Sequence, residues 1–254
     1  MKITLLGTGT SQGVPVIGCD CEVCRSENVF DQRLRSSILV ESEGTTLVID
    51  TGPDFRTQML RCGNQNLNGV LFTHAHKDHT AGLDDIRPYF FKTKKPVDLY
   101  GLPVTLNQIK EEFGYMFHEN KYPGVPDVNL HHLNAEEEFQ IGNLKIQPLK
   151  LQHAKADVLG YRFGEFAYIT DANFIPQKTF EKLAGIRFLV INALRKTAHP
   201  SHFTLEEALA ICDKLDVEKA WFTHISHGMG LHTIVNAALP ESRKLAYDGL
   251  EINY

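Results

Sequence analysis

The sequence has no uninterrupted apolar run close to the roughly 20 residues that a membrane-spanning helix needs. Its first residues, Met1–Thr4, lead straight into a strand-like segment and do not have the pattern of a signal peptide. These absences predict a cytoplasmic protein that does not bind membranes.

Clusters of basic residues are also scarce, since Lys92–Lys95 is the only short stretch rich in lysine. The formal net charge is −5, with 26 basic against 31 acidic residues. Because proteins that track a phosphate backbone usually present a basic face, an extended nucleic-acid partner is not expected. Two bound divalent ions would add about four positive charges to one pocket, so a small anionic substrate remains compatible with this composition.

Cysteine is too sparse and too unevenly spaced for a disulfide framework. Three of the five cysteines form the pattern Cys19-x-Cys21-x-x-Cys24, which is closer to metal-ligand spacing than to disulfide pairing. We expect reduced thiols. Cys62 and Cys212 stand alone in apolar surroundings, where buried packing is the better interpretation.

Strand-like segments recur along the chain, and 43% of all residues are hydrophobic, which is ample for a buried core. These segments are Lys2–Gly7, Ser36–Glu43, Thr45–Asp50, Gly69–Thr73, Val97–Tyr100, Leu144–Leu151, Leu159–Phe163, Phe166–Thr170, Phe188–Asn192, Ala220–Thr223 and Leu250–Asn253. Several follow one another without an intervening helix. The pattern therefore predicts two packed sheets covered by helices rather than a regular alternation of strand and helix.

Three helices are predicted between the strands, over Thr204–Leu215, Thr105–Phe117 and Pro53–Arg61. The first has a capping-box signature in Thr204 and Glu207, and the third is followed by the terminating glycine of a helix. No linker rich in Ser, Pro or Gly divides the chain, so we expect a single domain over residues 1–254.

The densest group of metal-ligand side chains is His74-x-His76-x-Asp78-His79, directly after the predicted strand that ends at Thr73. Imidazole suits Zn, Mn or Fe, and a carboxylate can bridge two ions. We expect His74 and His76 to bind one ion, and Asp78 and His79 to bind a second. Each ion then needs further ligands from elsewhere in the chain.

This motif resembles the His-x-His-x-Asp-His motif of the metallo-β-lactamase superfamily. The resemblance implies an α/β (α+β) fold, a four-layer αββα sandwich in which two mixed β-sheets are flanked by helices. It also implies His153, Asp171 and His224 as further ligands at strand ends, with Asp171 bridging both ions. The first ion would be held by His74, His76, His153 and Asp171, and the second by Asp78, His79, His224 and Asp171. Asp50 would support the ligand loop.

Within that superfamily the chain is similar to PhnP-type phosphodiesterases over nearly its full length. The likeness rests on Gly7–Pro15, on the three clustered cysteines and on Thr223–His227. It implies a separate structural zinc bound by Cys19, Cys21, Cys24 and His227, with the zinc-binding loop at about residues 18–25. Three thiolates and one imidazole suit a closed structural site.

Two further residues are candidates for contact with the substrate. His202 matches an active-site histidine of PhnP-like enzymes, which implies a phosphate contact or a general acid, although a polar residue of a turn is the alternative. Arg87 could approach a phosphate, although an Asp–Arg pair on a helix surface is equally compatible with the sequence.

These features predict a dinuclear metal-dependent hydrolase that acts on small phosphodiesters, including cyclic ones, through a metal-bridging hydroxide. Asp78, Asp171 and His202 are the expected catalytic residues. The alternatives are hydrolysis of a thioester, a lactone or an RNA 3′ end on the same scaffold, or a metal-binding protein without turnover. A homodimer is compatible with the sequence.

Overall fold

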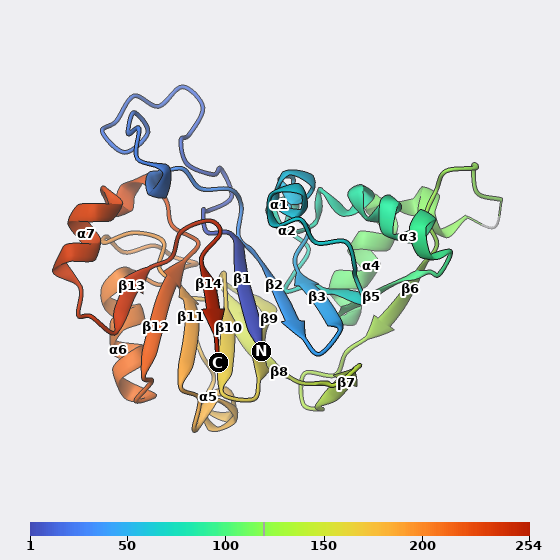
Figure 1. Cartoon of the computed structure of the whole chain (residues 1–254). Helices are drawn as coiled ribbons and strands as arrows, with labels where there is room; N and C mark the ends of the chain where they lie inside the picture. The colour runs from blue at the N-terminus through green and yellow to red at the C-terminus, as the bar shows by residue number, and fades with distance from the viewer. Residues whose placement is uncertain (119) are drawn as a thin grey trace.

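The computed structural model describes residues 1–118 and 120–254, and its two seven-stranded β-sheets pack face to face (Figure 1). The order of strands in the first sheet is β14-β1-β2-β3-β4-β5-β6. Its strands are β1 (Lys2–Gly7), β2 (Ser37–Ser42), β3 (Thr45–Ile49), β4 (Gly69–Leu71), β5 (Val97–Gly101), β6 (Val128–His132) and β14 (Glu251–Asn253).

The second sheet has the order β13-β12-β11-β10-β9-β8-β7. Its strands are β7 (Phe139–Ile141), β8 (Leu144–His153), β9 (Ala156–Phe163), β10 (Phe166–Ile169), β11 (Phe188–Asn192), β12 (Lys219–Thr223) and β13 (Arg243–Leu245). In both sheets three antiparallel pairings are followed by three parallel ones, from β3 to β6 and from β10 to β13. The two sheets therefore share one pattern of strand pairing without a repeat in residue identity, although β14 of the first sheet comes from the C-terminal end of the chain.

Alternation along each strand divides the hydrophobic side chains between two layers. In β3, Leu47 and Ile49 belong to the core between the sheets, whereas Val48 faces the helices outside the first sheet. In β11, Val190 lies in the central core and Ile191 in the outer one. Because both faces of these strands are buried, their sequences are continuous apolar runs. The predicted αββα sandwich is confirmed.

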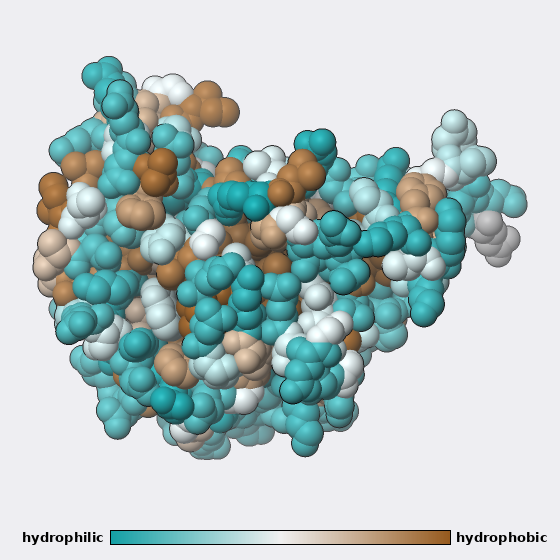
Figure 2. All heavy atoms as spheres, viewed as in Figure 1, coloured by the Kyte–Doolittle hydropathy of each residue, from teal (hydrophilic) through white to brown (hydrophobic). Residues whose placement is uncertain are grey.

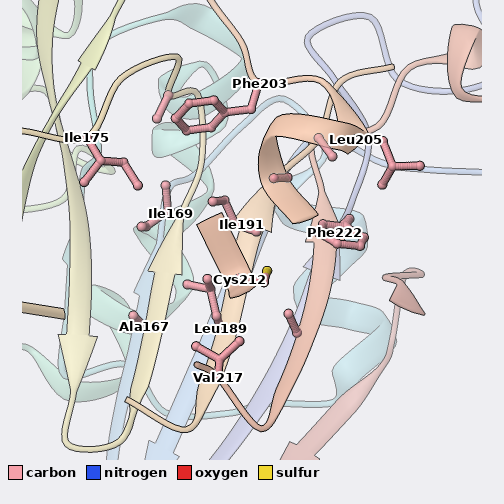
Figure 3. Packing of buried hydrophobic residues seen from close by; sticks show 14 of the residues in the cluster. Ala167, Ile169, Ile175, Leu189, Ile191, Phe203, Leu205, Cys212, Val217 and Phe222 are labelled. Atoms are coloured by element: carbon pink, nitrogen blue, oxygen red, sulfur yellow. The ribbon is translucent and has the colours of Figure 1, made fainter. Parts of the chain in front are cut away.

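Helices α5 (Gln177–Leu183), α6 (Leu205–Lys214) and α7 (His232–Ala238) contribute to the outer core of the second sheet or flank it. Figure 3 shows Leu205 and Cys212 of α6 in one cluster with Leu189, Ile191 and Phe222 of the sheet. The predicted capping box is present, since Thr204 Oγ1 accepts from Glu207 N at 3.2 Å and Glu207 Oε2 accepts from Thr204 N at 2.8 Å.

The first sheet is covered by α1 (Phe55–Cys62) and α4 (Pro103–Glu112), with α2 (Lys77–Thr80) and α3 (Arg87–Thr93) beside them (Figure 1). Gly63 ends α1 at a φ of 66°, a conformation that glycine adopts without strain. The predicted helix over 105–117 was wrong at both ends. It begins at Pro103, whose fixed φ suits a first helical turn, and gives way after Glu112 to a short 3₁₀ helix over Gly114–Phe117.

Three strands at the sheet margins, β6, β7 and β13, were not predicted from the sequence. Each is short, and β6 ends in two histidines, so its composition does not favour a strand. Cys212 is buried as expected, whereas Cys62 is only half-buried. Within the described ranges, no helix combines the length and the apolar character that a bilayer crossing would require.

The segment between β1 and β2 projects above α7 in Figure 1, and Figure 2 shows hydrophobic atoms on this projection. It is mostly turns, with one short 3₁₀ helix at Val29–Asp31, and Ile17 within it is fully exposed. A segment with so little hydrophobic packing needs another source of stability, and a bound metal is a common one.

The capping box yields a test of stability. We expect Thr204→Ala to lower the free energy of unfolding by about 1 kcal/mol, because the first turn of α6 loses its side-chain acceptor. Urea unfolding would measure the change. Thr233→Ala in α7 removes a threonine from an exposed helical position and serves as the matched control, with a change below about 0.5 kcal/mol. Equal losses in both variants would contradict the assignment.

Candidate metal centres

The candidate ligands lie at the carboxyl ends of strands from both sheets. In the first sheet, Asp50 follows β3 and His74 lies three residues after β4. In the second sheet, His153 is the last residue of β8, Asp171 comes two residues after β10 and His224 directly follows β12. Because these strand ends meet at one end of the sandwich, side chains as far apart in the sequence as Asp78 and His224 come together.

Three of these residues have a left-handed backbone. The φ angles of Asp50, Asp171 and His224 are 65°, 52° and 55°. Asp and His tolerate this region better than most residues, yet it still costs about 1–3 kcal/mol at each position. Such strain persists where the surrounding structure fixes the side chain. Here Asp171 and His224 lie in one group of candidate ligands, and Asp50 contacts His79 of the same group.

A first group consists of His74, His76 and His153, whose ligand atoms lie within 4.8 Å of one another. The ring centroids of His74 and His76 are 4.5 Å apart, and those of His76 and His153 are 5.1 Å apart. His74 and His153 are buried, whereas His76 is exposed. The group therefore opens to solvent on the side of His76.

A second group consists of Asp78, His79, Asp171 and His224. His79 Nε2 lies 3.2 Å from Asp78 Oδ2 and 3.1 Å from Asp171 Oδ2. His224 Nε2 lies 3.1 Å from Asp171 Oδ1. The two groups adjoin, because the ring centroids of His74 and His79 are 4.3 Å apart.

Asp50 fixes the orientation of His79. Both side chains are fully buried, and His79 Nδ1 donates to Asp50 Oδ2 at 2.7 Å. Thr73 donates to the same carboxylate through its backbone N and its hydroxyl, both at 2.8 Å. Nδ1 of His79 therefore carries a proton, and Nε2 faces the cluster. Such support from a carboxylate is common behind metal-bound histidines.

The other buried imidazoles are held in the same manner, through Nδ1. His153 Nδ1 donates to the carbonyl oxygen of Ser201 at 2.9 Å. His74 Nδ1 lies 3.0 Å from the Thr73 hydroxyl, and His224 Nδ1 lies 3.3 Å from the Ser36 hydroxyl. The Nε2 atoms of His74 and His79 are buried and have no hydrogen-bond partner within the described part of the chain.

The charge states suit metal binding. Burial, together with the neighbouring His79, holds the pKa of His74 well below its ordinary value. Burial by itself would raise the pKa of Asp171, but His224 and His79 outweigh it and hold this pKa well below the usual range. Burial by itself would lower the pKa of His79, but Asp171, Asp50 and Asp78 outweigh it and hold this pKa well above its ordinary value. A cation bound at His79 would therefore take the place of a proton, whereas His74 and Asp171 already have the neutral and ionised forms that bind metals.

The donor set fits divalent ions. Ligands about 2.0–2.2 Å from a tetrahedral ion lie roughly 3.3 Å from one another, close to the separations around His79 and Asp171. A buried nitrogen without a partner is unfavourable, and a bound metal ion would provide one for the unpaired Nε2 atoms. The two groups can therefore hold metal ions between them.

A separate group lies on the projecting segment. Cys19 Sγ is 3.3 Å from His227 Nδ1, and the sulfurs of Cys21 and Cys24 are each 3.5 Å from the same nitrogen. A zinc ion with bonds of about 2.3 Å to sulfur and 2.0 Å to nitrogen separates these atoms by roughly 3.5 Å. All five cysteines of the chain are free. The group fits a closed tetrahedral site that joins the projection to the loop after β12.

His202 stands beside both groups. Its ring centroid lies 4.7 Å from that of His153 and 4.8 Å from that of His224, and its Nδ1 is 3.8 Å from Asp171 Oδ1. Burial, aided by His224, lowers the pKa of His202 to about 3. His202 therefore lies where it could contact a substrate bound at the cluster. Its burial differs from that of a polar residue in an exposed turn.

Arg87 lies in a different environment. Its guanidinium donates to Asp84 and lies 6.0 Å from the centre of the Tyr115 ring. The groups of side chains that can hold a metal ion consist of other residues. The surface Asp–Arg pair is therefore the arrangement that the structure contains.

Several supporting groups were not anticipated from the sequence. The Ser36 hydroxyl is one, and the Thr10 hydroxyl, 3.3 Å from His224 Nε2, is another. The Ser201 carbonyl is a backbone group, so the type of the residue does not indicate its role. The position of Ser201 next to His202 in His199-Pro200-Ser201-His202 was the only available signal.

The model of the β-lactamase superfamily domain matches residues 45–225, which include every ligand of the two buried groups. The chain belongs to the metallo-β-lactamase superfamily. Its resemblance to PhnP is confirmed by the crystal structure of a new diphosphatase from the PhnP family, which is 40% identical. That match covers 99% of this chain and 96% of the other, with a TM-score of 0.92.

Among curated proteins, an octanoyltransferase of Porphyromonas gingivalis is 40% identical over 99% of this chain and 51% of its own length. A ribonuclease Z of Methanococcus maripaludis is 27% identical over 54% of this chain and 39% of its own length. The chain thus spans about half, or less, of the length of these two relatives. Their names describe longer proteins.

The cysteine group yields a test by metal analysis. We expect Cys21→Ser to lower the zinc content of the purified protein by about one ion per chain, because a closed site loses one of its four ligands. Cys62→Ser is the matched control, since Cys62 lies outside the group. Unchanged zinc content in Cys21→Ser, measured by plasma mass spectrometry, would show that the group does not bind zinc.

Proposed function

We propose that this chain is a metal-dependent hydrolase of small phosphodiesters, including cyclic ones. The observation that carries the proposal is the convergence of five imidazoles and two carboxylates, next to a buried histidine that is not needed as a ligand. Two of the imidazoles, His74 and His79, have an unpaired Nε2 atom within the described residues. Metal-dependent hydrolysis is the chemistry to which such an arrangement is suited.

In this proposal two divalent ions, of Zn, Mn or Fe, occupy the buried groups. His74, His76 and His153 would hold one ion, Asp78, His79 and His224 would hold the other, and Asp171 would serve as a ligand between them. When bound, the ions supply Lewis acidity that polarises phosphoryl oxygens and activates water. The zinc at Cys19, Cys21, Cys24 and His227 is structural.

The protein's own groups then position the reacting parts. Asp50 and the Ser201 carbonyl keep His79 and His153 in the tautomer that presents Nε2 to the cluster. Asp78 and Asp171 place negative charge where cations must bind. His202, which is buried beside Asp171 and whose lowered pKa keeps its ring neutral near neutral pH, contacts the phosphoryl group and donates a hydrogen bond to the departing oxygen.

Three observations support a small phosphate ester as substrate. The solved relative from the PhnP family is described as a diphosphatase. The chain is acidic overall, with a net charge of −5, and lacks an extended basic run for a long RNA. The buried groups open to solvent at His76. A cytoplasmic location and the formation of a homodimer stay predictions from the sequence.

A substrate panel tests the proposal. Metal-loaded protein should hydrolyse bis-p-nitrophenyl phosphate and a 2′,3′-cyclic nucleotide far faster than a lactone, an acyl thioester or a precursor tRNA. The thioester belongs in the panel because one relative is named an octanoyltransferase. Preference for the thioester, the lactone or the RNA would replace the proposal with that activity, and loaded but inert protein would indicate binding without turnover.

Asp171→Ala should abolish turnover and remove metal from the buried groups, because one carboxylate serves both proposed ions. Metal content and activity should fall together, with turnover reduced by at least about a thousandfold. Asp157→Ala is the control, since Asp157 is a half-exposed partner of Lys150 on the surface. Turnover at the wild-type rate in Asp171→Ala would rule out the proposed site.

His202→Ala should separate chemistry from metal binding. We expect kcat to fall by about 10²–10⁴, as for loss of a general acid or a charge-stabilising contact, while the metal content stays at the wild-type value. His131→Ala, at a half-exposed histidine that pairs with Asp98, is the control. Loss of metal in His202→Ala would instead make His202 a ligand, as its grouping with His153 and Asp171 also allows.

A further inference from the structure

The segment 195–202, between β11 and α6, is cationic. It contains Arg195, Lys196, His199 and His202 and has no acidic residue, although the chain as a whole has a net charge of −5. Only His202 of these four has a place in the proposed reaction. Arg195, Lys196 and His199 are therefore positive or hydrogen-bonding groups that have no role in the proposed reaction.

Hydrogen bonds hold this segment in one shape. Leu194 N donates to Phe203 O at 2.9 Å and closes its base. Inside it, Arg195 Nε donates to the carbonyl oxygen of Thr197 at 3.2 Å, and Arg195 Nη2 donates to that of Ala198 at 2.8 Å. A segment fixed in this way can present side chains to a ligand without a large cost in ordering.

Two further bonds join the segment to the metal centre. His153 donates to the carbonyl oxygen of Ser201, and Asn173 Nδ2 donates to that of Pro200 at 3.0 Å. Asn173 is only two residues beyond Asp171. The position of the segment is thereby set relative to the proposed metal ligands.

A row of imidazoles leads from the buried cluster toward solvent. The ring of His202 lies 4.7 Å from that of His153, and the ring of His199 lies a further 5.0 Å from that of His202. His153 and His202 are 8% and 9% exposed, whereas His199 is half-buried. The row therefore continues outward from His202, the residue proposed to contact the phosphoryl group, to the half-buried His199.

His199 is arranged as a hydrogen-bond donor. Ser201 N donates to His199 Nδ1 at 3.4 Å, and the Ser201 hydroxyl lies 3.2 Å from the same atom. With Nδ1 accepting, the neutral ring carries its proton on Nε2. Burial, together with the charge of Arg195, lowers the pKa of His199, and the same charge would attract an anion.

We propose that His199 binds a second phosphoryl group, adjacent to the one that is attacked, so that the site takes disubstituted diphosphates. The inference rests on the proposed phosphoesterase function and specifies its substrate class. His199 Nε2 donates to an oxygen of the second phosphoryl group, while Arg195 holds the segment and contributes positive charge. A substrate with one phosphorus does not reach His199.

Two variants separate binding from support of the turn. In His199→Asn, the amide oxygen can replace Nδ1 as the acceptor for Ser201, but no donor remains at the position of Nε2. In His199→Gln, the longer amide restores a donor near that position. Thermal unfolding of both variants would check that the segment stays folded.

The first measurement is calorimetric titration of metal-loaded protein with inorganic diphosphate and, separately, inorganic phosphate. Loss of one hydrogen bond to a charged group predicts an affinity for diphosphate about tenfold weaker in His199→Asn. The ratio of diphosphate to phosphate affinity should fall by the same factor, and His199→Gln should recover most of it. Wild-type protein that binds diphosphate no better than phosphate would overturn the inference.

The second measurement compares kcat/KM for diadenosine diphosphate with kcat/KM for bis-p-nitrophenyl phosphate. In His199→Asn the ratio should fall about tenfold, mainly through KM for the diphosphate. Parallel losses for both substrates, or none, would show that His199 only supports the turn. If wild-type protein binds diphosphate through His199 but hydrolyses neither ester, the inference stands and the proposed function fails.

Discussion

Burial of negative charge is the constraint around which the candidate site is built. Asp50 and Asp171 are 0% and 2% exposed, and an isolated carboxylate in such a place would be very costly. Asp50 is compensated by two bonds from Thr73 and one from His79. Asp171 has a bond from the Thr170 hydroxyl at 2.7 Å and two imidazoles about 3 Å away. The proposed cations complete this balance, and the strained backbone at both positions is tolerated because these contacts fix it.

The shared topology of the two sheets explains how one chain assembles such a site. Parallel strands place their carboxyl ends at one end of a sheet, and each sheet has a run of such strands. Packing the sheets face to face brings the end of β4 opposite those of β10 and β12. The central core, in which Leu71 meets residues such as Tyr168 and Val190, therefore sets the distance between the two halves of the metal centre.

The sequence anticipated the parts of this structure that side-chain chemistry marks. Four ligand-type side chains within six residues predict a metal site at His74, His76, Asp78 and His79. Continuous apolar runs such as Phe188–Asn192 predict buried strands. Residues such as His153 and His224 became candidates only through the family resemblance, because a single histidine at a strand end has no distinctive local pattern. The short strands β6, β7 and β13 were missed because pairing with neighbours, rather than composition, makes them strands. The Ser201 carbonyl could not be foreseen, since every residue has one.

The antiparallel pairing of β1 with β14 places the two termini side by side, with Met1 N donating to Tyr254 O at 2.6 Å. The chain runs from there along β1 to Thr10, whose hydroxyl lies 3.3 Å from His224 Nε2, so both termini lie at the end of the sandwich remote from the candidate site (Figure 1). A domain joined to either terminus would attach at that far end and leave the mouth of the site uncovered. The fold is thus suited to serve as a module in a longer polypeptide, whichever order the modules take, and the octanoyltransferase matches this chain over only 51% of its own length.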